Sequence, residues 1–129
     1  MVGLVILSHS LKIAEGVREL ALEMSPEVPI FATGGTEDGR LGSDFHKVCE
    51  AIRKAYSPKG VIVLFDLGSA FMNGEMAIEA LSSELGGNIE MVDAALVEGA
   101  ITAAVEISLG KSMEQVKESL SRLCIGKIS

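Results

Sequence analysis

The feature that most constrains the fold is an unbroken apolar run at residues 2–7, Val-Gly-Leu-Val-Ile-Leu, which stops abruptly at Ser-His-Ser. Aliphatic and β-branched residues without polar alternation are typical of a parallel strand that is buried on both faces. Apolar residues at helical spacing follow at once, over residues 11–24. A strand that leads directly into a helix is the start of a βαβ unit, so this segment predicts an α/β fold.

The same alternation of strand and helix continues along the chain. Strands are predicted at residues 28–32, 61–65 and 89–92, and helices at about 43–57, 72–86, 94–109 and 112–123. Ser43 is the predicted N-cap of the second helix, and Ser112 with Gln115 has the spacing of a capping box. Short connections predict right-handed crossovers, and therefore a three-layer α/β/α fold around a central, mostly parallel four-stranded sheet. Residues 123–128 are a candidate fifth strand at the sheet edge, and the sequence leaves open whether two protomers exchange it.

Length and charge restrict the class of protein. The 129 residues, 48% of them hydrophobic, suit one domain over residues 1–129. The net charge of −7 and the lack of a basic run argue against nucleic acid or an anionic membrane as partner. No apolar stretch approaches the ~20 residues that span a bilayer, and the first residues lack the basic leader of a signal peptide. Cys49 and Cys124 lack metal or redox spacing, so core packing is favoured over a disulfide, and the expected location is cytoplasmic.

Three polar segments, residues 8–10, 33–42 and 66–70, follow predicted strands and should meet at the carboxyl-end edge of the sheet. His9 and Asp66 are the predicted catalytic residues. A carboxylate beside the imidazole can accept a hydrogen bond from one ring nitrogen and leave the other free to attack phosphorus. The alternative is that His9 helps to cap a helix and that Asp66 only ends a strand. His46, beside Lys47, is predicted to be a surface residue.

Two turns are candidates for phosphate binding, because exposed backbone N–H groups hold anions. The residues are Gly34, Gly35, Thr36, Gly68, Ser69 and Ala70. An ordinary turn role for these glycines is an equal alternative. Asp66 also suggests a receiver domain, whose phospho-accepting aspartate ends the third strand, but Ser-His-Ser stands where that domain needs an acidic pair for Mg²⁺. No metal site is predicted. Neither G-x-x-x-x-G-K-[ST] nor a complete G-x-G-x-x-G after the first strand is present, which argues against a self-sufficient nucleotide kinase or a dinucleotide enzyme.

Three motifs, in order, resemble the phosphocarrier subunit of the phosphotransferase-system-dependent dihydroxyacetone kinase, of the mannose-type enzyme IIA fold family. They are V-I-L-S-H-S at 5–10, T-G-G-T-E-D-G-R-L-G at 33–42 and L-F-D-L-G-S-A-F-M-N at 64–73. The resemblance covers nearly the whole chain, and its most specific part is residues 66–73.

The resemblance implies a phosphotransferase subunit. His9 would accept a phosphoryl group from the histidine phosphocarrier protein HPr, and Asp66 would orient the imidazole. The acceptor would be ADP held on the nucleotide-binding subunit of the kinase, so no cofactor is expected on this chain, while ADP or ATP with Mg stays on the partner. Some family members carry further phosphotransfer domains at the C-terminus; this chain ends at Ser129, and we expect a separate donor protein.

The surface around His9 is expected to dock these partners. The candidate docking residues are Ser10, Leu11, Arg40, Leu41, Phe71, Met72 and Asn73. The resemblance also implies a homodimer, in which the alanine-rich stretch at 94–104 packs either against a second copy or against the chain's own sheet.

Two alternative functions remain open on the sequence alone. One is the enzyme IIA component of a mannose-type sugar transporter, with the same chemistry and a different acceptor. The other is a non-catalytic regulatory module that binds a small anion in its glycine loops.

Overall fold

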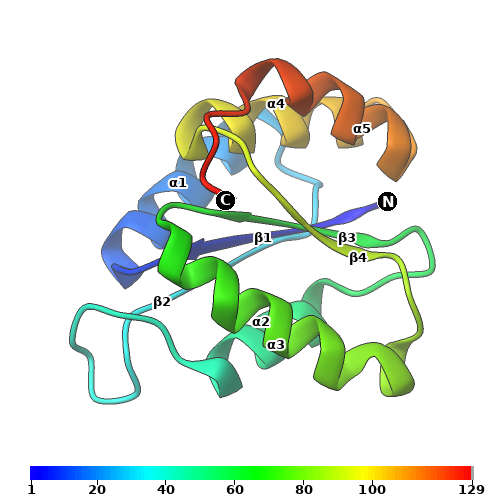
Figure 1. Cartoon of the computed structure of the whole chain (residues 1–129). Helices are drawn as coiled ribbons and strands as arrows, with labels where there is room; N and C mark the ends of the chain where they lie inside the picture. Colours follow the sequence, from blue (N-terminus) through cyan, green and yellow to red (C-terminus); the bar gives the residue numbers. More distant parts are fainter. Residues whose placement is uncertain (129) are drawn as a thin grey trace.

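Four parallel strands form the centre of the computed structural model, which describes residues 1–128 (Figure 1). They are β1 (Gly3–Ser8), β2 (Ile30–Gly34), β3 (Val61–Phe65) and β4 (Ile89–Val92), in the order β2-β1-β3-β4. Every residue of the two central strands, β1 and β3, is buried. This burial on both faces accounts for their unbroken apolar sequences, and the predicted parallel four-stranded sheet is confirmed.

Helices cover both faces of the sheet (Figure 1). The helices are α1 (Leu11–Met24), α2 (Phe45–Ala55), α3 (Gly68–Leu85), α4 (Leu96–Ser108) and α5 (Met113–Leu120). Successive residues of β1 alternate between two cores, because neighbouring side chains on a strand point to opposite faces. Leu4 and Ile6 pack with α1, α4 and α5, whereas Val5 and Leu7 pack with α2 and α3. The three-layer α/β/α prediction is therefore confirmed.

Helix ends follow local capping chemistry, with one correction. The side chain of Ser10 caps α1, and Ser112 with Gln115 forms the predicted capping box of α5. The N-cap of α2 is Asp44 rather than the predicted Ser43: the Asp44 carboxylate accepts the Lys47 N–H at 2.9 Å. The Ser43 hydroxyl instead accepts a hydrogen bond from the side-chain amide of Asn73.

The suggested fifth strand is absent from the described residues, whose sheet has four strands. Residues 121–123 form a short 3₁₀ turn, and residues 124–128 cross the carboxyl-end edge of the sheet near the start of α3 (Figure 1). The main-chain N–H groups of Lys127 and Ile128 donate to the Asp93 carboxylate, at 2.6 and 3.2 Å. These N–H groups therefore bind a side chain and form no strand ladder.

The alanine-rich stretch packs within its own chain. Ala94, Ala100, Ala103 and Ala104 are fully buried against the core that α4 shares with α1 and the sheet. Of the two alternatives for this stretch, packing against the chain's own sheet is the one observed. No helix among residues 1–128 combines the length and apolarity needed to cross a membrane. Cys49, which is buried, and Cys124, which is exposed, are both free.

Candidate active site

His9 and Asp66 meet because they follow the ends of the two central strands. Leu7 of β1 pairs in register with Phe65 of β3, so the residues just beyond them lie at the same edge of the sheet. The distance from His9 Nδ1 to Asp66 Oδ1 is 3.2 Å. The predicted pairing of these two side chains is therefore present.

A set of donors surrounds the Asp66 carboxylate. The Ser8 hydroxyl donates to Oδ2 at 2.6 Å and the His9 main-chain N–H donates to the same atom at 3.1 Å. The Leu67 N–H donates to Oδ1 at 2.7 Å. Burial by itself raises the pKa of Asp66, but these hydrogen bonds outweigh it and hold that pKa below its ordinary value. Asp66 is thus a carboxylate at neutral pH.

An ionised Asp66 fixes the tautomer of His9. A carboxylate only accepts hydrogen bonds, so Nδ1 must carry the proton and donate it. The other ring nitrogen, Nε2, lies 2.6 Å from the Ser69 hydroxyl, and in this tautomer Nε2 accepts from that hydroxyl. The two nitrogens of His9 therefore have different partners, one anionic and one neutral.

Nε2 also lies at the N-terminus of α3. That helix begins at Gly68, and its N-cap residue, Leu67, gives no side-chain capping hydrogen bond. The Ala70 N–H donates to the Leu67 carbonyl at 3.0 Å. The partial positive charge of a helix N-terminus favours an anion beside it. Of the predicted phosphate-binding residues, Ser69 is thus brought next to the imidazole, while Gly68 and Ala70 flank it in the first turn of α3.

The glycine-rich segment at residues 33–42, called the glycine loop from here on, packs against the turn that carries His9. A Cβ atom on Gly34 would lie 2.7 Å from the Ser8 carbonyl oxygen and 3.0 Å from the Leu11 nitrogen, so only glycine fits there. The Gly42 N–H donates to the His9 carbonyl at 2.8 Å. These two contacts, one at each end of the loop, fix the backbone on either side of the imidazole.

The polar groups of Thr36 are used inside the loop. Its N–H donates to the Arg40 carbonyl at 2.8 Å, and its hydroxyl donates to Asp38 Oδ1 at 2.5 Å. The Arg40 side chain pairs with Asp38 at 2.9 Å, and both are exposed. Gly35 has the positive φ of 75° that this turn requires. Phosphate binding by Gly34, Gly35 and Thr36 stays a prediction.

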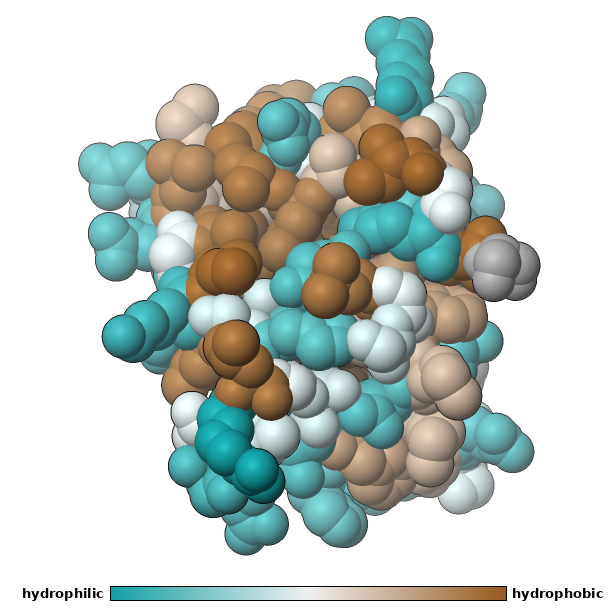
Figure 2. Space-filling view, turned by 60° about the vertical axis from the view of Figure 1, so that its left-hand side comes forward, coloured by the Kyte–Doolittle hydropathy of each residue, from teal (hydrophilic) through white to brown (hydrophobic). Residues whose placement is uncertain are grey.

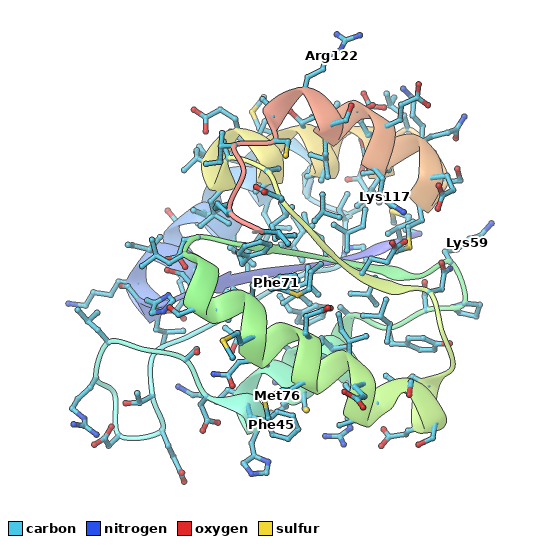
Figure 3. All side chains as sticks on the ribbon, viewed as in Figure 1. Phe45, Lys59, Phe71, Met76, Lys117 and Arg122 are labelled. Carbon is cyan, nitrogen blue, oxygen red and sulfur yellow. The ribbon has the colours of Figure 1, made fainter. Side chains whose placement is uncertain are left out.

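The predicted docking residues divide into two groups. Leu11, Arg40, Leu41 and Met72 are exposed, and Leu41 is the most open of the three apolar residues at 78%. Ser10, Phe71 and Asn73 have partners inside the chain, and the Ser10 side chain caps α1. Figure 3 shows Phe71 between α3 and the sheet, with its ring centroid 5.5 Å from that of Phe65. Asn73 donates to the Ser43 hydroxyl at 2.6 Å and so links α3 to the glycine loop.

Sequence reasoning missed three residues of this site. Ser8 stood within a polar segment already singled out, so its position could have suggested a second donor to Asp66. Leu67 is an exposed apolar residue that directly follows Asp66. Lys127, distant in sequence, places its ammonium group on the carbonyl of Phe65, and nothing in its local sequence indicates that contact. His46, by contrast, is exposed as predicted.

No group of three or more His, Cys, Asp or Glu side chains within residues 1–128 is arranged to hold a metal ion. Around His9, the described residues bring together an imidazole, a carboxylate and two hydroxyl groups, with the Lys127 ammonium group on the carbonyl of Phe65.

Comparisons with known proteins agree on one family. Residues 3–117 match the family model described as the PTS system fructose IIA component, EIIA-man. The chain is 38% identical over 124 residues to "PEP-dependent dihydroxyacetone kinase 2, phosphoryl donor subunit DhaM" of Listeria innocua, which covers 95% of this chain and 99% of the relative. It is 36% identical to the phosphotransferase subunit DhaM of Lactococcus lactis, and this alignment covers 97% of this chain and 98% of the relative.

The Escherichia coli DhaM subunit is longer: the match is 38% identical and covers 90% of this chain but 25% of that protein. Among solved structures, the unknown function protein EF1359 aligns with a TM-score of 0.83 and 33% identity over 94% of this chain and 93% of its own. A sigma-54 interaction domain protein from Enterococcus faecalis, at 18% identity and a TM-score of 0.71, shares the fold. The family match and the DhaM relatives lead to the same conclusion: this chain belongs to the EIIA-man family.

Proposed function

We propose that this chain is a phosphoryl carrier of a phosphotransferase-system-dependent dihydroxyacetone kinase and that it holds the phosphoryl group on Nε2 of His9. The observation that carries the proposal is that the two ring nitrogens of His9 have different partners. Nδ1 is bound to Asp66 at 3.2 Å, while Nε2 faces Ser69 and the N-terminus of α3. Relatives named as phosphoryl donor subunits DhaM support the choice of kinase.

The chemistry follows from the proton on Nδ1. In the first half-reaction the Nε2 lone pair forms a bond to phosphorus while the bond between phosphorus and the donor nitrogen breaks. The positive charge that develops on the ring is stabilised by Asp66 through the Nδ1–H. In the second half-reaction an oxygen of the acceptor attacks phosphorus and the N–P bond breaks. His9 then returns to its neutral form, with the proton still on Nδ1.

Groups at the start of α3 would hold the phosphoryl oxygens. The Ser69 hydroxyl, which donates to Nε2 before the reaction, would turn to donate to a phosphoryl oxygen after it. The N–H groups of Gly68 and Ser69 lie in the first turn of α3 and favour negative charge there. Phosphoryl transfer depends mainly on positioning and on electrostatic stabilisation, and these groups would supply both.

The donor and the final acceptor would come from other proteins in the cytoplasm. The proposed donor is HPr, and the proposed acceptor is ADP, with its Mg, on the nucleotide-binding subunit of the kinase. Both would dock over His9, where Leu11, Leu41, Leu67 and Met72 expose apolar side chains around a polar centre. An apolar patch with polar surroundings is the usual composition of such an interface.

A sugar transporter is the second candidate acceptor, because the matching family model is described as a fructose IIA component. The His9 chemistry would be unchanged, and the phosphoryl group would pass to a transporter IIB protein. The non-catalytic alternative, an anion-binding module, predicts no covalent phosphorylation at all.

The test is phosphorylation by phosphoenolpyruvate, enzyme I and HPr. We expect an acid-labile phosphoryl group on the wild type and on His46→Ala, whose exposed side chain lies outside the site, and none on His9→Ala. Labelling of His9→Ala would refute the assignment, and an unlabelled wild type would favour the anion-binding module. A chase of the labelled protein with the ADP-loaded kinase subunit or with a IIB protein identifies the acceptor.

A homodimer is also part of the proposal, through a surface formed by α1 and α4. Ile13, Leu20 and Met24 form one exposed stripe on α1, and Val97 is exposed on α4, which packs against α1. Figure 2 shows hydrophobic side chains gathered over the upper left of the molecule, on the side where these helices lie. A contiguous exposed apolar surface of this kind is typical of an interaction site.

A further inference from the structure

Residues 124–128 are fixed beside the candidate active site. The Ala95 N–H donates to the Leu123 carbonyl at 2.9 Å, which fixes the start of this segment. The Asp93 carboxylate then accepts the main-chain N–H groups of Lys127 and Ile128, at 2.6 and 3.2 Å. All three hydrogen bonds reach the connection between β4 and α4, so the segment has a defined path over the carboxyl-end edge of the sheet.

The side chain of Lys127 joins the end of β3 to the connection between β4 and α4. Its ammonium group donates to the carbonyl of Phe65, the last residue of β3, and to the carbonyl of Ala94 at 2.8 Å. It also lies 4.5 Å from the centre of the Phe65 ring, in the geometry of a cation–π contact. The Lys127 carbonyl, in turn, would lie 3.3 Å from a Cβ atom on Gly68, so the segment touches the first residue of α3.

These contacts hold the peptide from which Asp66 projects. The Asp66 N–H donates to the Leu7 carbonyl at 3.2 Å, on the side of β1. The carbonyl of the same peptide, that of Phe65, accepts from Lys127. With its N–H and its carbonyl both bound, the peptide plane is fixed, and so is the direction in which the Asp66 side chain leaves the backbone. A rotation of this peptide would move the carboxylate away from His9 Nδ1.

A partly buried cation at this place needs compensation for its lost hydration. Desolvation lowers the pKa of Lys127, and the carboxylates of Asp93 and Asp66 counteract part of that effect. A lysine that served only to tether the chain end could make its contacts in water, without losing hydration and side-chain freedom. Lys127 is placed instead where it bonds to β3 and attracts the Asp66 carboxylate.

We propose that Lys127 is a positioning residue of the phosphoryl-transfer site: by fixing the Phe65–Asp66 peptide, it holds the carboxylate that orients His9. This inference rests on the proposed function for its effect on phosphoryl transfer. Its structural part, the placement of Asp66 against the imidazole, is independent of any phosphoryl donor. Lys127 lies outside the residues matched by the family model, 3–117.

The test compares Lys127→Met, which keeps the length of the side chain and removes its donors, with Lys127→Arg, which keeps a cation that donates hydrogen bonds. The control is Lys59→Met, because Figure 3 shows Lys59 pointing away from the molecule. In the unphosphorylated protein, ¹⁵N NMR of the imidazole reports the tautomer of His9, and ¹³C NMR of the carboxyl group reports the pKa of Asp66. We expect Lys127→Met to raise that pKa and to mix the two tautomers, with Lys127→Arg close to wild type.

Rates of phosphorylation by HPr provide the second measurement. We expect about tenfold slower loading in Lys127→Met, since a small displacement of an orienting group is costly, and near-normal loading in Lys127→Arg and Lys59→Met. A wild-type NMR signature and a wild-type rate in Lys127→Met would overturn the inference. If Lys127→Met does not fold, Lys127→Gln takes its place in both measurements. A wild type that HPr does not label would refute the proposed function, while the NMR comparison would still decide the role of Lys127.

Discussion

The imidazole of His9 is held by Asp66 through Nδ1, at 3.2 Å, and this leaves Nε2 as the nitrogen that faces α3. The arrangement depends on a charge: Asp66 must be ionised for Nδ1 to carry the proton. Three donors besides the imidazole, from Ser8, His9 and Leu67, keep it so. In the proposed function, the hydrogen-bond network around the carboxylate therefore decides which nitrogen of His9 is the nucleophile.

Replacing Asp66 with asparagine tests that choice. The amide keeps the shape of the side chain but removes its charge, and its NH₂ group can turn toward Nδ1 and favour the wrong tautomer. We expect the rate of phosphoryl transfer from HPr to fall by roughly 10²-fold or more, with an unchanged circular dichroism spectrum. Rapid-quench kinetics measure the rate. An unchanged rate would remove Asp66 from the mechanism.

Replacing Ser69 with alanine tests the partner of Nε2. The hydroxyl lies 2.6 Å from that nitrogen, and in the proposal it holds a phosphoryl oxygen after transfer. We expect Ser69→Ala to be phosphorylated about ten- to a hundredfold more slowly, because one donor to the developing charge is lost. Ser119→Ala, on α5, is the control and should keep the wild-type rate. Equal rates in the two variants would assign Ser69 a passive role.

Acid titration provides a prediction about stability. The folded-state pKa of Asp66 lies below its ordinary value of 3.8, so its ionised form stabilises the fold. This contribution is fully present above pH 3.8 and is lost as the pH falls from there through the folded-state pKa. We expect the difference in unfolding free energy between wild type and Asp66→Asn to shrink in that window. Urea unfolding at a series of pH values measures it, and a difference independent of pH would contradict the assignment.

The fold and the centre of the site could be predicted because they depend on local patterns. Buried parallel strands need unbroken apolar runs. Because the carboxyl ends of parallel strands lie at one edge of the sheet, His9 and Asp66, which follow two such strands, are expected at the same edge. The use of the polar groups could not be predicted in the same way. Thr36 binds within its own loop and Asn73 binds Ser43, and both outcomes depend on how loops fold back in space. The contact of Lys127 with the Phe65 carbonyl is the hardest to predict from sequence, because 62 residues separate the two.

The apolar stripe on α1 predicts the oligomeric state. Leu20 is exposed at the centre of this stripe in the single chain, and we expect a second copy to cover it. Leu20→Glu would bury an unpaired charge in that interface, at a cost that the dimer cannot offset. We expect this variant to be monomeric in light scattering, and Met76→Glu, an equally apolar exposed position on α3, to remain dimeric. A monomeric wild type would contradict the proposed dimer.

Gly34 and Gly16 form a pair of opposite predictions for the same substitution. Alanine at Gly34 would press its Cβ atom against the Ser8 carbonyl and the Leu11 nitrogen, both of them main-chain atoms that cannot rotate away. We expect Gly34→Ala to lower the unfolding free energy by about 1–3 kcal/mol and, by displacing the turn around His9, to slow its phosphorylation. Gly16, inside α1, has open space around it, so Gly16→Ala should raise the unfolding free energy by about 0.5–1 kcal/mol and leave phosphorylation unchanged. Urea unfolding measures both values. Equal effects at the two positions would show that the close approach of the glycine loop to the His9 turn does not constrain the site.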